Sequence, residues 1–277
     1  MLAYSPRVKI SEREAGAFLA VALEAAERAG AATLPFFRAG GKVDDKRVEA
    51  EAGRDFDPVT EADRAAEAVV RERLGNAFPE HGLYGEEFGL QEGNGLTWVI
   101  DPIDGTRGFI TGMLHWGVLL GLFDGQEPVL GVMHQPFTGE TFFGAAGRTG
   151  WRRGGEERAL RVRPCAELAD AALGATTPLM FKETGRRAAF DRVDERVRFT
   201  RLGGDCYNYA LLAMGCLDLV VEDSLQPYDI QALIPIVRGA GGLVTSWTSG
   251  DPSMGGAVVA AGDARVHDEA LRLLNSK

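Results

Sequence analysis

Residues 98–109 read WVIDPIDGTRGF and join a β-prone apolar run to two aspartates that lie three positions apart. This order predicts a buried strand that enters a tight turn, because Pro102 fixes its own φ and Gly105 supplies backbone freedom. Such a turn brings Asp101 and Asp104 together, and two close carboxylates repel each other unless a proton or a cation lies between them. Mg²⁺ accepts oxygen ligands of this kind, especially when a phosphate completes its shell. A solitary DxxD is more often an Asx-turn with a helix cap, so the rest of the chain must decide.

Size and composition narrow the class of protein. The chain has 277 residues, 45% of them hydrophobic and 25% charged, which suits one large globular domain or two moderate ones. A net charge of −10 and the lack of a Lys/Arg run make nucleic acid and anionic membrane poor partners. The first residues lack the apolar core of a signal peptide, and the longest apolar run, 116–123, is too short to cross a bilayer. The three cysteines and four histidines lack metal-type spacing, which favours a reducing cytoplasm and argues against a zinc hydrolase.

The N-terminal half predicts two helices and a large sheet. The capping box SERE at 11–14 opens a long amphipathic helix that is expected to continue to residue 36. A charged surface loop over 39–57 leads to a second helix with Thr60 as its N-cap. A short strand over 83–87 precedes the strand of the central motif. Four further β-like segments predict one large antiparallel sheet, at 116–123, 128–135, 140–146 and 158–163.

From about residue 164 onward, strands and helices alternate. Strands are predicted at 173–177, 197–202, 217–222, 243–247 and 256–261, and helices at 205–215, 228–239 and up to 274. Alternation of this kind favours a second sheet with its own helices. We therefore predict two subdomains, residues 1–163 and 164–277, that share an interface.

Five carboxylates stand out because each follows a predicted strand or opens a predicted helix: Asp63, Glu86, Asp101, Asp104 and Asp229. Taken singly, each is more simply explained as a helix cap or a solvated acid. As a set they occupy turn-like contexts, where ligands cluster at the ends of secondary structure, and this makes them candidates for one shared site.

Four motifs together resemble the inositol monophosphatase superfamily of Mg²⁺-dependent phosphomonoesterases: DPVTEAD at 57–63, GEEFG at 85–89, DPIDGT at 101–106 and PYD at 227–229. The resemblance runs from the first helix to the last. It implies a mixed α and β fold, a layered α-β-α-β-α sandwich of the inositol monophosphatase / fructose bisphosphatase type. In that fold the large sheet is antiparallel and the smaller sheet is mixed.

The resemblance also implies roles for individual residues. Thr106 and Glu86 would position and activate a metal-bound water, with Asp63 hydrogen-bonded to the threonine hydroxyl. The backbone amides of Gly105 and Thr106, at a helix start, would hold phosphate oxygens. The expected ligands of two or three Mg²⁺ ions are Glu86, Asp101, the Ile103 carbonyl, Asp104 and Asp229.

The chemistry of phosphate transfer supports a metal requirement. It needs charge neutralisation and an in-line water more than covalent help from the protein. Carboxylates alone would repel the substrate, so cations are obligatory in this hypothesis. The family lysine that precedes the DxVT segment is either Lys42 or Lys46, and Tyr228 replaces the usual Trp before the last aspartate.

The segments 106–122, 203–215 and 218–242 resemble the histidinol-phosphatase branch of the superfamily. On the substrate side this points to Asp205 and Glu222, with Gly204, Asp104 and Asp229 beside them. Two acids near the leaving group suit the ammonium and imidazole of histidinol phosphate, through charge-assisted hydrogen bonds of about 1.5–3 kcal/mol each. Asp205 is equally explained as a helix N-cap, and Glu222 as a solvated acid at a strand end.

The leading hypothesis is a cytoplasmic, Mg²⁺-dependent histidinol-phosphate phosphatase of histidine biosynthesis. A broad inositol- or sugar-phosphate phosphatase is the alternative enzyme, and a catalytically silent metal- and phosphate-binding regulator is the alternative of another class. The expected partner is a small phosphorylated substrate, with neither nucleic acid nor membrane. A homodimer is expected only because the family forms one.

Overall fold

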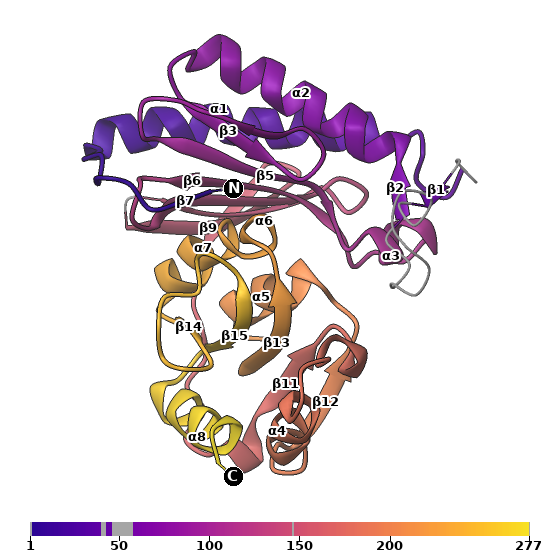
Figure 1. Cartoon of the computed structure of the whole chain (residues 1–277), viewed down its shortest axis with the longest axis vertical. Coiled ribbons are helices and arrows are strands. Elements are labelled where there is room, and N and C mark those ends of the chain that lie inside the picture. Colours follow the sequence, from indigo (N-terminus) through magenta and orange to yellow (C-terminus); the bar gives the residue numbers. More distant parts are fainter. Residues whose placement is uncertain (1, 40–42, 46–57, 146, 277) are drawn as a thin grey trace.

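The computed structural model describes residues 2–39, 43–45, 58–145 and 147–276. The main layers are two helices, a large sheet, three helices, a smaller sheet and two further helices. Figure 1 shows them stacked in this order. This order confirms the predicted α-β-α-β-α sandwich. No helix in these ranges is long and apolar enough to cross a membrane.

The outer layer consists of α1 (Glu12–Thr33) and α2 (Glu61–Ala77). α1 begins at the predicted capping box, where Ser11 Oγ accepts the Glu14 N–H at 3.3 Å and the Glu14 carboxylate accepts the Ser11 N–H at 2.9 Å. The helix ends three residues before the predicted position 36. Thr60 lies in the short strand β2 (Pro58–Thr60), which pairs with β1 (Val43–Asp45), and its expected cap lies outside the described side chains, as do Lys42 and Lys46.

The large sheet has the strand order β10-β9-β8-β7-β6-β5-β3-β4. Its strands are β3 (Gly82–Gly85), β4 (Gly89–Gln91), β5 (Thr97–Asp104), β6 (Gly117–Phe123), β7 (Pro128–Gln135), β8 (Glu140–Ala145), β9 (Arg148–Arg153) and β10 (Glu156–Ala159). All neighbours are antiparallel except β3 and β5, which run parallel, so the large sheet is mixed rather than wholly antiparallel. The parallel pair arises because β4 folds back on the outer edge of β3, after which the chain returns to the inner edge of β3.

The edge hairpin of β9 and β10 corrects the prediction of a strand at 158–163. Gly154 and Gly155 form its two-residue turn with φ of 55° and 88°, the backbone that two-residue hairpins need. Charged residues on both sides of this turn hide the apolar alternation from which strands are predicted. The two glycines therefore form the hairpin turn although the flanking residues show no apolar alternation.

The smaller sheet has the strand order β12-β11-β13-β15-β14 and is mixed, as predicted. Its strands are β11 (Ala172–Ala175), β12 (Phe199–Leu202), β13 (Leu219–Leu225), β14 (Leu243–Ser246) and β15 (Gly256–Ala261). α5 (Cys206–Ala213), α6 (Pro227–Ile230) and α7 (Leu233–Gly239) lie between the two sheets, while α4 (Arg186–Asp194) and α8 (Ala264–Leu274) cover the far side (Figure 1).

Two helical details differ from the prediction. The helix expected over 228–239 is two short helices, because Pro235 has no N–H to offer the Gln231 carbonyl. The helix α4 was not predicted, since only Ala189, Phe190 and Val193 face the core in an otherwise charged segment.

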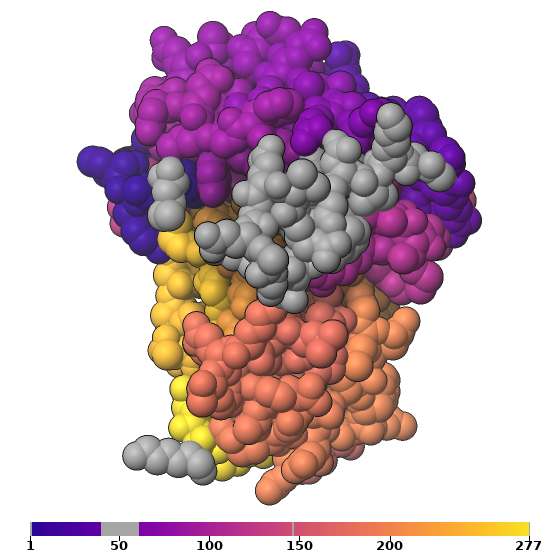
Figure 2. All heavy atoms as spheres, turned by 45° about the vertical axis from the view of Figure 1, so that its right-hand side comes forward, coloured from indigo at the N-terminus to yellow at the C-terminus, as the bar shows by residue number. Residues whose placement is uncertain are grey.

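The two sheets share one hydrophobic core around the middle helices. This cluster contains Leu119 and Met133 of the large sheet together with Val220 and Val258 of the smaller one. Figure 2 shows the N-terminal half, in indigo to magenta, resting directly on the C-terminal half, in salmon to yellow. The boundary between residues 163 and 164 stays a prediction, since the core extends across it.

Candidate functional site

A β-bulge at the end of β5 aims the two motif aspartates at the same face of the sheet. Residues three apart in a regular strand point to opposite faces. Here Asp101 pairs with Leu119 and Asp104 with Gly117, so β5 has one more residue than β6 between these two pairs. The packing confirms the switch, because Ile103 joins Ala62 of α2 in a core cluster and thus faces the outer helices. Asp104 therefore shares a face with Asp101.

Asp101 is the most deeply placed acid of the motif. It is 2% exposed, and its Oδ1 accepts the Ile103 N–H at 3.1 Å. Burial raises the pKa of Asp101 well above its usual value, and the negative charges of four neighbours raise it further: Glu86, Asp104, Asp229 and Asp63. Acids predicted from four separate segments thus lie close enough to Asp101 to repel its charge.

Asp104 joins the large sheet to the helix layer. Its Oδ2 accepts the Cys206 N–H at 2.7 Å, at the start of α5. Burial raises its pKa well above the usual range, the charges of Asp205 and Asp229 add to this, and the hydrogen bonds from Cys206 oppose it. The contact holds a motif acid of β5 beside a residue that lies 102 positions later in the chain.

Asp229 completes a three-carboxylate cluster. One of its oxygens accepts the Gln226 N–H at 2.7 Å at the start of α6, which fixes the side chain. Carboxylate oxygens of Asp101, Asp104 and Asp229 all lie within 4.8 Å of one another. One divalent cation with oxygen ligands at about 2.0–2.6 Å can bridge groups at such a spacing, and a hard cation suits an all-oxygen set. The cluster therefore fits a divalent cation, which would relieve the mutual repulsion that adds to burial in raising the pKa values of Asp101 and Asp104.

Thr106, Ile103 and Gly105 form the turn beside these acids. The Thr106 hydroxyl donates to the Ile103 carbonyl at 3.1 Å, and this carbonyl keeps a second lone pair for another partner. Gly105 has φ of 82°, and a Cβ there would lie 2.5 Å from the His115 carbonyl oxygen, so only glycine fits. The predicted hydrogen bond from Thr106 to Asp63 stays a prediction. The predicted binding of phosphate by the Gly105 and Thr106 amides also stays a prediction, because α3 (Thr106–Ile110) has only five residues.

A cleft of about 780 Å³ opens next to the acid cluster. Asp104 and Asp229 lie in its wall, and the expected substrate residues Gly204, Asp205 and Glu222 also line it. Three cationic side chains also line the cleft, those of Arg107, Lys182 and Arg201. The cleft thus joins an anionic cluster that fits cations to a chamber large enough for a small phosphate ester.

Asp205 occupies the N-cap position of α5, but its side chain makes no capping hydrogen bond there. Its backbone has φ of 47°, an unusual value for a residue other than glycine. Burial raises the pKa of Asp205 to about 6, against the lowering effects of the Gly204 N–H and the Arg107 charge. The helix-cap explanation is therefore wrong for its side chain, which lines the cleft.

Glu222 is 2% exposed, so the explanation of a solvated acid is wrong. Its Oε1 accepts the Thr176 N–H at 3.0 Å and the Thr176 hydroxyl at 2.6 Å, and its Oε2 accepts the Tyr209 hydroxyl at 3.0 Å. Burial raises the pKa of Glu222 to about 7 despite the Thr176 hydrogen bonds, and the charge of Asp205 contributes. Thr176 and Tyr209 are site residues that the sequence analysis missed, because no local pattern marks a partner of a distant acid.

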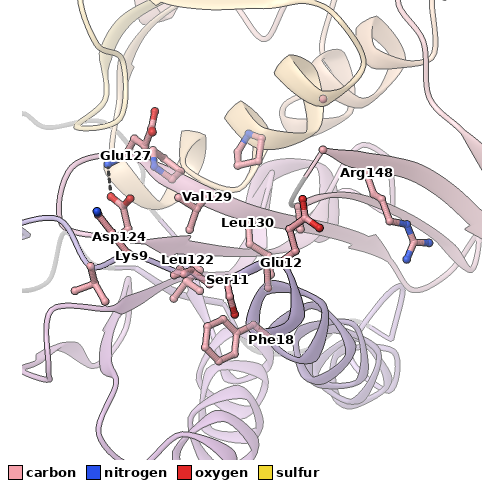
Figure 3. Close-up of a pocket in the computed structure, with 18 of the residues that line it drawn as sticks. Lys9, Ser11, Glu12, Phe18, Leu122, Asp124, Glu127, Val129, Leu130 and Arg148 are labelled. Atoms are coloured by element: carbon pink, nitrogen blue, oxygen red, sulfur yellow. Dashed lines mark hydrogen bonds between the residues drawn. The ribbon is translucent and has the colours of Figure 1, made fainter.

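A second cavity of about 600 Å³ is lined by the N-terminal segment, α1, α7 and the turns beyond β6 and β8 (Figure 3). Its floor is apolar, with Phe18, Leu122 and Leu130. Asp124 in its wall already accepts the Glu127 N–H at 2.8 Å (Figure 3). This cavity holds none of the clustered acids and is set apart from the candidate site.

Known proteins resemble the chain over nearly its whole length. Residues 15–276 match the model of the inositol monophosphatase family. The bifunctional phosphatase IMPL2, chloroplastic, of Arabidopsis thaliana is 38% identical over 96% of this chain and 77% of that protein. A histidinol-phosphatase of Mycobacterium tuberculosis is 35% identical over 93% of this chain and 98% of that protein. The solved structure of an inositol monophosphatase from Zymomonas mobilis is 38% identical, with a TM-score of 0.83 over 96% of this chain and all of that one. The chain therefore belongs to the inositol monophosphatase family and is a phosphatase of that family.

Proposed function

We propose that this protein is a Mg²⁺-dependent phosphatase that hydrolyses histidinol phosphate to histidinol and phosphate. The observation that carries the proposal is the pair of buried acids, Asp205 and Glu222, in the same cleft as the three-carboxylate cluster. A cationic leaving group explains why two acids outside the three-carboxylate cluster line the cleft, since a neutral polyol does not require them. The similarity to a histidinol-phosphatase over 93% of the chain supports the same substrate.

The proposed site would hold two or three Mg²⁺ ions on Glu86, Asp101, the Ile103 carbonyl, Asp104 and Asp229. When bound, these ions would neutralise the negative charge of the phosphate and lower the pKa of a coordinated water toward neutrality. Thr106 and Glu86 would position and activate the attacking water in line with the leaving oxygen, and Asp63 would be hydrogen-bonded to the threonine hydroxyl in place of the Ile103 carbonyl. The amides of Gly105 and Thr106 would hold phosphate oxygens.

Asp205 lies beside Asp104 and Gly105, where it would accept a hydrogen bond from the substrate cation. Its pKa of about 6 leaves it ionised in neutral solution. Glu222 already accepts three hydrogen bonds, and its pKa of about 7 leaves it partly ionised in neutral solution, so it would act on the substrate through a partial negative charge rather than through a new contact. Gly204, which lines the cleft, is restricted to glycine because its φ is 146° and a Cβ there would lie 2.2 Å from Asn208 Oδ1.

A substrate panel tests the proposal. Purified protein with Mg²⁺ should release phosphate from histidinol phosphate with a higher kcat/KM than from inositol 1-phosphate or fructose 1,6-bisphosphate. A preference for a polyol ester would reject the substrate and retain the phosphatase class. That outcome would favour the second candidate, an inositol-phosphate phosphatase, which the 38% identity to the Zymomonas mobilis protein supports.

The remaining expectations belong to the same proposal. A cytoplasmic location and a homodimer are proposed, and sedimentation of the purified protein would test the latter. Glu86→Gln should retain ligand binding and lose turnover. A silent regulator would instead show no phosphate release in the wild-type protein.

A further inference from the structure

The turn that carries Glu86 is held from beneath by a fully buried carboxylate. Glu67 of α2 has no exposed surface, and its Oε2 accepts the Glu87 N–H at 2.7 Å while its Oε1 accepts the Phe88 N–H at 3.3 Å. Both donors belong to the tight connection between β3 and β4, directly after Glu86. The backbone N–H of Glu86 itself donates to the Ile100 carbonyl of β5 at 3.3 Å.

Arg71, one helical turn after Glu67, closes the arrangement. Its Nε donates to Glu67 Oε1 at 2.7 Å, its Nη2 donates to the Gly89 carbonyl, and its guanidinium lies 5.8 Å from the centre of the Phe88 ring. The pair therefore contacts the turn through two N–H groups, one carbonyl and one aromatic ring. A buried charge is costly unless it is paired and hydrogen-bonded, and here both conditions are met.

Gly85 shows how closely the carboxylate approaches the turn. A Cβ at this position would lie 1.9 Å from Glu67 Oε1 and 2.3 Å from its Cδ. The glycine thus makes room for the acid, and its φ is not in the left-handed region that glycine alone favours. We refer to Glu67, Arg71 and Gly85 as the turn clamp.

We propose that the turn clamp is a positioning device that sets the side chain of Glu86 toward Asp101, and so tunes the affinity of the site for Mg²⁺. The strand pairing places Glu86 beside the Asp101 end of β5, because Gly85 pairs with Ile100 and the Glu86 N–H donates to the Ile100 carbonyl. Groups that orient a metal ligand from behind typically change metal affinity or activity by about 10–100-fold when they are mutated. The inference rests on the proposed metal site, and Glu67 acts only through the turn.

The matched experiment compares Glu67→Gln with Glu24→Gln. Glu24 of α1 forms a more exposed Glu–Arg pair with Arg73 of α2, with Arg73 Nη2 2.7 Å from Glu24 Oε2. It touches no residue of the 85–89 turn in any described hydrogen bond or ion pair. Calorimetric titration with Mg²⁺ alone, without substrate, should show binding weakened by about tenfold or more in Glu67→Gln and unchanged in Glu24→Gln. Amide hydrogen exchange at Glu87 and Phe88 should also become faster in Glu67→Gln only.

Gly85→Ala is a second variant that perturbs the clamp without changing a charge, because its new methyl group must displace the Glu67 carboxylate. It should weaken Mg²⁺ binding in the same direction, and the double variant should lose less than the product of the two single losses. Equal Mg²⁺ affinity in wild type and whichever of these variants folds would overturn the inference. Absence of Mg²⁺ binding to the wild-type protein would instead reject the metal site on which the proposed function depends.

Discussion

Substitution of Asp205 by Asn separates recognition of a cationic substrate from the rest of the site. Asn has nearly the same shape, and it is one of the few residues that tolerate a positive φ, here 47°. The change therefore removes the charge without adding backbone strain. Alanine would mix the two effects.

The expected magnitude follows from the environment of this carboxylate. Its pKa of about 6 means that it is ionised at about pH 8, where the assay is best performed. A hydrogen bond to a charged group contributes about 1.5–3 kcal/mol, which corresponds to about a 10- to 150-fold loss in kcat/KM for histidinol phosphate. A neutral ester such as inositol 1-phosphate lacks the partner for this interaction and should lose far less.

The assay is phosphate release from both esters at saturating Mg²⁺. The charge of Asp205 also raises the pKa of Asp104, so the substitution can alter metal binding. Saturation with Mg²⁺ and the ratio of the two kcat/KM values remove this common effect. Asp191→Asn is the control for net charge, because Asp191 is an exposed partner of Arg187 on α4, on the far side of the smaller sheet.

A histidinol phosphate preference that survives Asp205→Asn would refute the recognition role. Equal losses for both esters would show that Asp205 supports the site as a whole. Either result would leave the acid cluster and the phosphatase class intact.

Three further outcomes follow from the buried charges and the turn. The pKa of Glu222 is raised from 4.5 to about 7, so its contribution to stability is full below pH 4.5 and is lost as the pH rises toward 7. Glu222→Gln should thus gain stability relative to wild type over that interval, by up to about 3 kcal/mol in urea denaturation; a pH-independent difference would contradict this. Asp101→Asn should raise the thermal unfolding midpoint of chelator-treated protein, because it removes repulsion between buried carboxylates. It should also abolish hydrolysis and the rise in thermal midpoint on addition of Mg²⁺. An unchanged rise with Mg²⁺ would place the cation elsewhere. Gly105→Ala should lower the free energy of unfolding by at least about 1–3 kcal/mol through its left-handed φ and the nearby His115 carbonyl, and an unchanged urea midpoint would show that the turn can relax.

Local patterns predicted much of the layered fold. The capping box at Ser11 and the apolar run of β6 mark their elements in sequence, because helix and strand periodicity arises from which face is buried. The parallel pairing of β3 with β5 was not predicted, since strand order depends on packing between distant segments. The hairpin of β9 and β10 and the helix α4 escaped because few of their residues are apolar and buried.

The candidate site was predictable to a different degree. The turn in the sequence predicted that Asp101 and Asp104 lie together. Only the resemblance to a family predicted that Asp229 lies with them, because it is too far along the chain for any local spacing to indicate the contact. Glu67 did carry a signal, since Asp63, Glu67, Val70 and Leu74 follow one another at helical spacing and all are buried. An acid on the apolar stripe of a helix indicates a buried partner, although it does not say which one.

Because of the bulge in β5, a single residue decides which face of the sheet the side chains at the end of this strand point to. Gain of a single codon between those for Gly117 and Leu119 would let β5 and β6 align without interruption, and the sheet would gain regularity. The same insertion would leave the two aspartates three apart in a regular strand, turn one carboxylate toward the outer helices and dismantle the cation site. A relative that kept the architecture and abandoned the chemistry could therefore arise in one genetic event.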